Sequence, residues 1–156
     1  MKKKELYISF SICIVIFCLI LLFFINRKQT ICTNSSDQSK NGYKLDTKYV
    51  IKSNWNKVKT VKVTETISSK DKKLLDKFKK QLEKQYSYNK KTYGGYTYKI
   101  ETNNNQIIGE ITIDYKEFDL EYFIENNEAM KEYTKNNKLT LDGAKKMYEA
   151  TGAVCK

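Results

Sequence analysis

The chain has no histidine, so its chemistry would have to come from carboxylates, lysines, tyrosines and cysteines. Histidine is the usual base that activates a serine or cysteine nucleophile and a common ligand of zinc, so both kinds of site are disfavoured. Gly94 and Gly95 form an isolated pair rather than a glycine-rich phosphate loop. We therefore expect a protein without catalytic residues, metal or cofactor.

Carboxylates are concentrated in residues 101–133, which contain nine acids and two lysines. Asp114, Glu117, Asp119 and Glu121 are closely spaced and could supply oxygen ligands to calcium. The glycine that an EF-hand loop needs at its sixth position is missing. In so acidic a run, pairs of carboxylates spaced as in a hydrolase arise by chance. We expect a solvated acidic edge.

Lysines and aromatic residues gather in the middle of the chain. Residues 52–91 carry 13 lysines and four acids, and Trp55 is the single tryptophan. Alternation predicts that Tyr96 and Tyr98 point into the core. Trp55 lies at a predicted hairpin tip, where it is either an exposed anchor for a partner or folded back on the sheet edge. The candidate partner-binding residues are Trp55, Tyr88, Tyr93, Lys72, Lys73, Lys79 and Lys80.

This charge distribution predicts a basic face. Such a face could contact anionic lipid, an anionic cell-wall polymer or another envelope protein. The alternative is that the lysines only keep the surface solvated. Nucleic acid is not an expected partner, because no arginine-rich or zinc-finger pattern is present.

A first hairpin is predicted from residues 43–51 and 58–67, with a turn at residues 53–56. Ser68 followed by Asp71 resembles a capping box and predicts a helix that runs to about Tyr86. Its apolar stripe has helical spacing and predicts a core-facing side. The stripe comprises Leu74, Leu75, Phe78, Leu82 and Tyr86.

A second hairpin is predicted from residues 93–102 and 107–115, because both segments alternate and an asparagine-rich turn joins them. Helices are expected over residues 118–133 and 140–151, the latter capped by Thr140 and ended by Gly152. The order β-β-α-β-β-α-α predicts an α+β fold with two layers. Helices would cover one face of an antiparallel sheet built from the two hairpins.

Residues 6–25 contain no charged side chain. A helix of this length would span about 30 Å, the thickness of a bilayer core. A cleaved signal peptide would have a shorter apolar region followed by small residues, so we expect an uncleaved signal-anchor. Residues 1–5 would be a short cytoplasmic tail, residues 26–42 a flexible tether, and residues 43–156 an extracytoplasmic domain of a single-pass cell-membrane protein.

The four cysteines fall into two pairs. Cys13 and Cys18 lie in the uncharged run, whereas Cys32 and Cys155 lie near the two ends of the outer part. In an exported domain Cys32 and Cys155 could form a disulfide, although the sequence leaves open whether they are unpaired thiols. Lipidation is not expected, because the small residues of a lipidation motif do not precede Cys13, Cys18 or Cys32.

Residues 96–101, 107–115 and 118–120, together with the capped helix and Gly152 within residues 139–155, resemble the YehR-like bacterial lipoprotein family. This is a family of unknown function, and the resemblance covers residues 43–156. It implies a small α+β domain at the outer face of a bacterial membrane and contributes no catalytic residue. Family members are anchored by a lipidated N-terminal cysteine, whereas this chain has a long apolar run instead.

These observations predict a membrane-anchored, non-enzymatic, extracytoplasmic binding domain of the bacterial envelope. One alternative is a structural or assembly partner of another membrane protein, acting partly through residues 6–25. A second alternative is an envelope hydrolase.

Overall fold

The computed structural model describes residues 27–156. The predicted cytoplasmic tail and membrane anchor, with Cys13 and Cys18, lie outside the described residues. Within residues 27–156 no helix combines the length and the apolar composition that crossing a bilayer requires.

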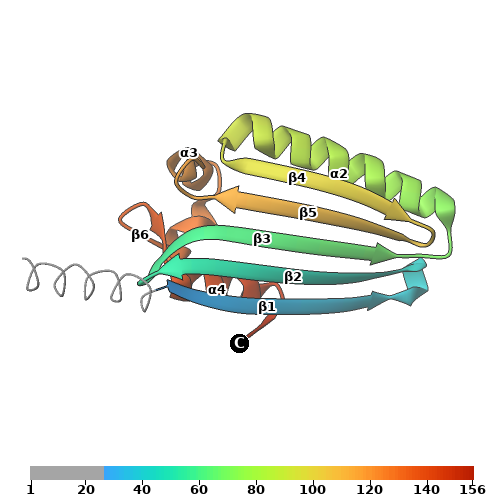
Figure 1. Ribbon diagram of the computed structural model, residues 1–156, viewed down its shortest axis with the longest axis horizontal. Helices are drawn as coiled ribbons and strands as arrows, with labels where there is room; N and C mark the ends of the chain where they lie inside the picture. The colour runs from blue at the N-terminus through green and yellow to red at the C-terminus, as the bar shows by residue number, and fades with distance from the viewer. Residues whose placement is uncertain (1–26) are drawn as a thin grey trace, which may run out of the picture.

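A six-stranded antiparallel sheet runs the length of the domain, in the spatial order β4-β5-β3-β2-β1-β8 (Figure 1). Its long strands are β1 (Arg27–Gln38), β2 (Tyr43–Asn54), β3 (Lys57–Ser68), β4 (Tyr96–Asn103) and β5 (Gln106–Asp114). The short strand β8 (Val154–Cys155) adds the end of the chain to the edge formed by β1. A short 3-10 turn, η1 (Ser39–Asn41), joins β1 to β2.

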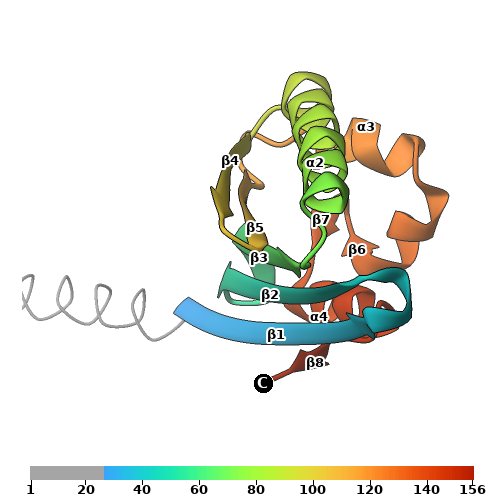
Figure 2. The same ribbon diagram turned by 90° about the vertical axis from the view of Figure 1, so that its right-hand side faces the viewer.

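Three helices lie on the same side of this sheet, which curls around them (Figure 2). They are α2 (Lys72–Tyr93), α3 (Leu120–Glu125) and α4 (Leu141–Ala150). The 3-10 helix η2 (Glu128–Tyr133) and a small hairpin, β6 (Thr134–Lys135) and β7 (Lys138–Leu139), connect α3 to α4. The expected α+β architecture, with helices on one face of an antiparallel sheet, is therefore confirmed.

The strands form a two-sided sheet because their apolar residues alternate and neighbouring strands are in register. One apolar row, read across four strands, is Ile51, Val61, Ile113 and Tyr96. The neighbouring row points to the opposite face and is polar on three strands, where it comprises Lys62, Thr112 and Thr97; its member on β2 is Val50. The helices cover the apolar face, and Tyr148 of α4 stacks on Tyr49 of β2 with ring centroids 4.0 Å apart.

The prediction of a flexible tether at residues 26–42 was wrong. Residues 27–38 form β1, which pairs with β2 over its whole length. The segment is polar because it lies near the edge of the sheet, where only Cys32 is fully buried. Its order comes from the backbone hydrogen bonds of a long ladder, which leave little trace in the side-chain pattern.

The helix boundaries also differ from the predictions. Ser68 ends β3, and the cap of α2 is Asp71, whose carboxylate accepts hydrogen bonds from the amides of Lys73 and Leu74. The helix continues to Tyr93 instead of ending near Tyr86.

Residues 118–133 form α3 and η2 rather than one continuous helix. The following β6–β7 hairpin was not predicted; its turn uses Asn136 and Asn137, both with positive φ. The start of the last helix was predicted correctly, because Thr140 accepts a hydrogen bond from the amide of Gly143. Gly152 has a φ of +87° and follows the helix as expected.

A disulfide joins Cys32 of β1 to Cys155 of β8. Cys32 has no exposed surface. Reciprocal backbone hydrogen bonds between Ile31 and Lys156 hold the same edge, with N–O distances of 3.1 and 2.9 Å. The pairing that the sequence left open is therefore present, and it ties the last strand of the chain to the first described one.

Candidate functional site

Helix α2 presents a basic face. It carries eight lysines and two acids, and all but one of the lysines are exposed. The lysines that form ion pairs within residues 27–156 are Lys44, Lys62, Lys99 and Lys131, none of which belongs to α2. The positive charge of the helix is therefore available to an external anion.

All four predicted partner-binding lysines lie in the first half of α2. Lys72, Lys73 and Lys80 are exposed, and Lys79 is half-buried. Lys72 and Lys73 occupy the first turn, which contains no acidic residue. Lysine in a first turn opposes the helix dipole by about 0.3–1 kcal/mol, so a purely structural helix would favour acids there.

Tyr88 belongs to the same exposed surface. Its side chain is 61% exposed, and Lys84 and Lys91 lie four and three residues away, on neighbouring turns. An exposed ring between two cations can contact the apolar part of a ligand whose charges bind the lysines.

Tyr93 was expected at the surface but is half-buried. Its ring lies 5.0 Å from that of Phe123 and 5.5 Å from that of Phe118. Its carbonyl accepts a hydrogen bond from the amide of Asp119 at 2.7 Å. Tyr93 therefore fastens α3 to the end of α2.

Trp55 occupies the tip of the β2–β3 hairpin and is 71% exposed. The sequence left open whether Trp55 is exposed or folded back on the sheet edge, and in the structure it is exposed. Its φ is +53°, a left-handed conformation that bulky residues seldom adopt. The cross-strand register pairs Asn54 with Arg27, so the tip lies beside the start of β1.

Next to this tip the surface encloses a hollow of about 660 Å³. Ser53 is only 3% exposed, and its hydroxyl has no hydrogen-bond partner; the same holds for the buried amide oxygen of Asn54. Sequence reasoning missed this hollow, because its residues come together only through strand pairing. The lining residues are Arg27, Lys28, Gln29, Lys52, Ser53, Asn54, Lys59 and Thr60.

A buried tyrosine meets a carboxylate beneath α2. The Tyr86 hydroxyl donates a hydrogen bond to Glu65 at 2.5 Å across β5. Gly109 makes this possible, because a Cβ there would lie 2.7 Å from the hydroxyl oxygen. Burial, followed by the negative charge of Glu65, raises the pKa of Tyr86 well above its usual value. Burial also raises the pKa of Tyr96 to about 12.

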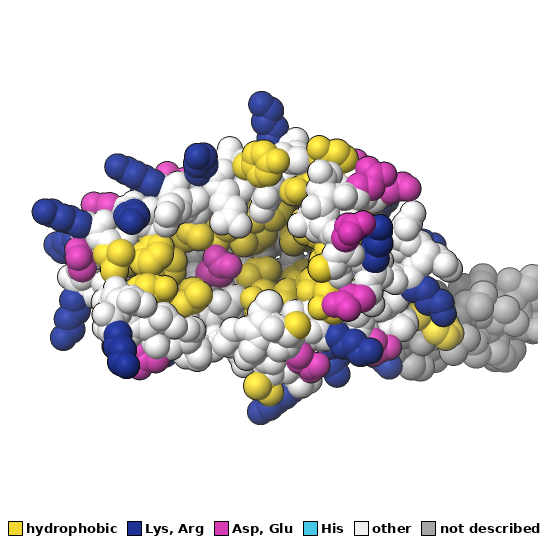
Figure 3. All heavy atoms as spheres, turned by 180° about the vertical axis from the view of Figure 1, so that it is seen from behind, with side chains coloured by type: hydrophobic (Ala, Val, Ile, Leu, Met, Phe, Trp, Pro, Cys, Tyr) yellow, Lys and Arg dark blue, Asp and Glu magenta, His cyan; other side chains and the backbone are white. Residues whose placement is uncertain are grey.

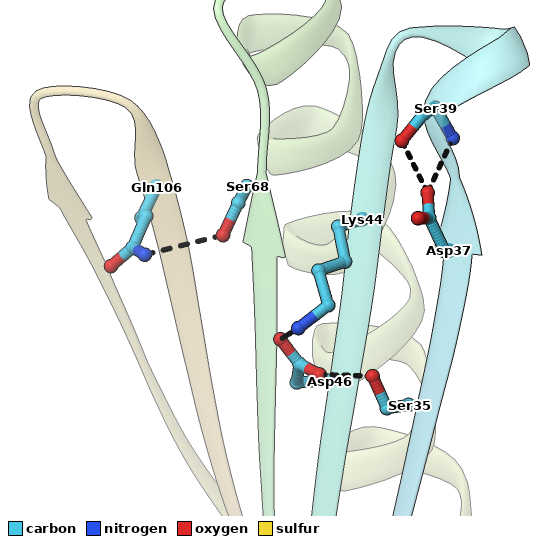
Figure 4. Close-up of polar contacts among 7 residues, drawn as sticks. All are labelled: Ser35, Asp37, Ser39, Lys44, Asp46, Ser68 and Gln106. Atoms are coloured by element: carbon cyan, nitrogen blue, oxygen red, sulfur yellow. Dashed lines mark hydrogen bonds and ion pairs between the residues drawn. The ribbon is translucent and has the colours of Figure 1, made fainter.

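The outer face of the sheet carries a satisfied polar network at the β1–β2 turn (Figure 4). Asp46 accepts a hydrogen bond from Ser35 and pairs with Lys44 at 2.9 Å. Asp37 accepts hydrogen bonds from the hydroxyl and amide of Ser39. The hydrogen bond from Ser35 is the main reason that the pKa of Asp46 is lowered. These carboxylates already have partners and stabilise the turn.

Two carboxylates of the predicted acidic edge have structural roles. The carboxylate of Asp114 accepts a hydrogen bond from the amide of Lys116, and that of Asp119 caps α3 through the amide of Tyr122. In the described part of the chain, no group of three cysteine or acidic side chains is placed to hold a metal ion.

The side of the sheet that carries the helices is hollowed below α2, and hydrophobic side chains line the hollow (Figure 3). Several apolar residues on this side remain only partly buried while packing against the smaller of the two core clusters. They are Tyr43, Leu45, Phe78, Leu82 and Ile100.

Comparison with known proteins shows a shared fold. No family model matches the chain, and no curated protein does so either. The NMR structure of the Escherichia coli YehR protein superposes with a TM-score of 0.53 and 18% identity, covering 82% of this chain and 91% of that one. The NMR structure of a Streptococcus pneumoniae TIGR4 protein gives a TM-score of 0.47 and 14% identity, with 82% and 83% covered.

Proposed function

We propose that this chain is a YehR-like, membrane-anchored, extracytoplasmic domain that binds an anionic polymer of the bacterial cell envelope and catalyses no reaction. The observation that carries the proposal is the basic face of α2, with its eight lysines and the exposed Tyr88. Two of the lysines stand in the first turn, where they oppose the helix dipole. Residues that weaken a local element are typical of a binding surface.

Two further observations support the envelope location. The disulfide between Cys32 and Cys155 favours an oxidising compartment outside the cytoplasm. The uncharged residues 6–25 precede β1 almost directly and favour a membrane anchor.

The geometry of α2 favours a polymer over a lipid surface. The helix has 22 residues and is therefore about 33 Å long. It lies along the strands, beside β4, and its last turn is at the same end of the sheet as the start of β1, although β1 lies toward the opposite edge (Figure 1). A bilayer at that end would attract only the last turns, because charges at physiological salt are screened within about 8 Å. A polyanionic chain could follow the whole face.

The direct test is binding of the full-length protein, in neutral detergent micelles, to polyglycerol phosphate over a range of salt concentrations. Wild-type protein should bind at low salt, with an affinity that falls as salt rises. Replacing Lys72, Lys73, Lys79 and Lys80 with glutamine should weaken binding at least about tenfold, since each exposed charge pair contributes up to about 1 kcal/mol.

A matched control removes the same charge elsewhere, by replacing the exposed Lys116, Lys135, Lys138 and Lys146 with glutamine. This variant should keep most of the affinity. Equal weakening in both quadruple variants would mean that only net charge matters, and the α2 site would be rejected. Absence of salt-sensitive binding by the wild type would favour the assembly-partner alternative.

A further inference from the structure

We propose that the hairpin tip at Trp55 and the basic hollow beside it form a second binding site, which docks on the headgroups of anionic phospholipids. This inference rests on the anchoring part of the proposed function, but it concerns a different surface from α2. Its partner is the bilayer itself.

The site lies at the end of the domain that directly follows the proposed membrane anchor. The uncharged residues 6–25 precede Arg27 by a single residue, and β1 begins at Arg27. The register pairs Arg27 with Asn54, which precedes Trp55 at the tip. If residues 6–25 span the bilayer, this end of the sheet is the part of the domain next to the lipid surface.

The side chains that line the hollow are suited to binding a phosphodiester. Lys28, Lys52 and Lys59 line it and are exposed, so their ammonium groups can approach a phosphodiester. Ser53 also lines the hollow, and its hydroxyl is buried without a partner, so a rotation of the side chain toward the hollow would let it donate a hydrogen bond to a phosphate oxygen. A bound headgroup would satisfy a polar group that otherwise destabilises the fold.

The acids near the tip lie outside the lining of the hollow. Asp142 lies near the tip and accepts a hydrogen bond from Asn56 at 3.2 Å. Asp114 lies opposite Thr60, and its carboxylate accepts the amide of Lys116. Neither carboxylate lines the hollow.

Trp55 is suited to the interface between lipid and water. Its indole is 71% exposed in a backbone conformation that a tryptophan adopts only with strain. Indole rings favour the interface between lipid and water, where the ring is apolar and the N–H remains wet. Cations and a tryptophan at one end of a sheet match an anionic headgroup layer.

The single tryptophan makes the test specific, because all tryptophan fluorescence comes from Trp55. The full-length protein is reconstituted into vesicles of phosphatidylcholine with brominated acyl chains, with or without phosphatidylglycerol. Docking should shift the Trp55 emission to shorter wavelength and increase its quenching when phosphatidylglycerol is present. Added salt should reverse both changes.

Substitutions locate the contact. Replacing Lys28, Lys52 and Lys59 with glutamine should lower the ratio of docked to undocked domain by about fivefold for each lysine. The control replaces the exposed Lys40, Lys48 and Lys70, none of which lines the hollow, and should leave quenching unchanged. Ser53→Ala should reduce docking without lowering the urea midpoint of the protein in detergent.

The possible negative results can be distinguished from one another. Protein that does not float with the vesicles contradicts the anchor and hence the proposed function. Protein that floats but shows equal Trp55 quenching with and without phosphatidylglycerol overturns this inference alone. Equal loss in the two triple variants also overturns it. If soluble glycerol phosphate binds the protein in detergent and abolishes quenching, the site takes a free phosphoester, and the membrane assignment is wrong.

Discussion

At the scale of single residues, the contact between Tyr86 and Glu65 beneath α2 depends on a glycine. The tyrosine is almost fully buried, and its hydroxyl reaches Glu65 only because Gly109 leaves space on β5. Even alanine at position 109 would force Tyr86 or the strand to move. Position 109 requires glycine because glycine has no side chain, and its conformational freedom is not the reason.

The buried tyrosines predict how stability depends on pH. In the folded protein burial raises the pKa of Tyr96 to about 12, and it also raises those of Tyr115 and Tyr148. Above about pH 10 the unfolded chain loses these protons while the folded protein keeps them, so the free energy of unfolding must fall. Below that pH their contribution is complete.

We therefore expect urea midpoints, followed by circular dichroism, to be nearly constant from about pH 6 to 9, because the chain has no histidine to titrate. They should drop between about pH 10 and 12. Tyr96→Phe should reduce the alkaline loss, and Tyr88→Phe, at an exposed position, should not. An unchanged midpoint at pH 11 would contradict this explanation.

At the scale of secondary-structure elements, α2 has two faces with separate roles. Its inner stripe packs on the sheet, where Leu75 and Tyr86 are buried and Phe78 is half-buried. Phe78 contacts Tyr43 edge to face, with centroids 4.9 Å apart. The outer face contributes little to packing, so stability and binding should be separable by mutation.

This separation gives a graded prediction. Leu75→Ala should lower the free energy of unfolding by roughly 2–5 kcal/mol, because the side chain is almost fully buried against Ile67 and Ile107. Phe78→Ala should have a smaller effect, since part of its ring is already solvated. Lys77→Ala, on the outer face, should change stability by less than about 0.5 kcal/mol. Urea unfolding would measure all three, and a larger loss for Phe78→Ala than for Leu75→Ala would refute this view of the core.

At the scale of the whole molecule, the disulfide closes the fold. Cys32 and Cys155 are 123 residues apart, and the bond fixes the end of the chain to the edge of the sheet. Without it, β8 would be held mainly by a two-residue ladder and the hydrogen bonds between Ile31 and Lys156.

Loss of this disulfide should lower the free energy of unfolding. For a loop of more than 100 residues, the chain-entropy model gives about 4–5 kcal/mol of stabilisation. Cys155→Ser, or reduction of the wild type, should lower the urea midpoint accordingly. Cys18→Ser, outside the described residues, serves as the control. If the oxidised and reduced proteins unfolded at the same urea concentration, the bond would have no role in stability.

The sequence by itself determined the elements with strong local signals. Alternation identified both hairpins, helical spacing identified the inner stripe of α2, and Thr140 and Gly152 marked the last helix. These signals were sufficient because burial of one face and capping of free amides act over a few residues. The absence of histidine and the basic character of α2 were equally evident.

Only the tertiary structure decided the rest. The strand β1 has no apolar period, and its order comes from pairing with β2. The pairing of Cys32 with Cys155 depends on the final strand reaching the edge of the sheet. The hollow beside Trp55 joins residues of β1, β2 and β3, because strand register brings together positions that are distant in the chain. Long-range hydrogen bonding sets that register, and no short segment encodes it.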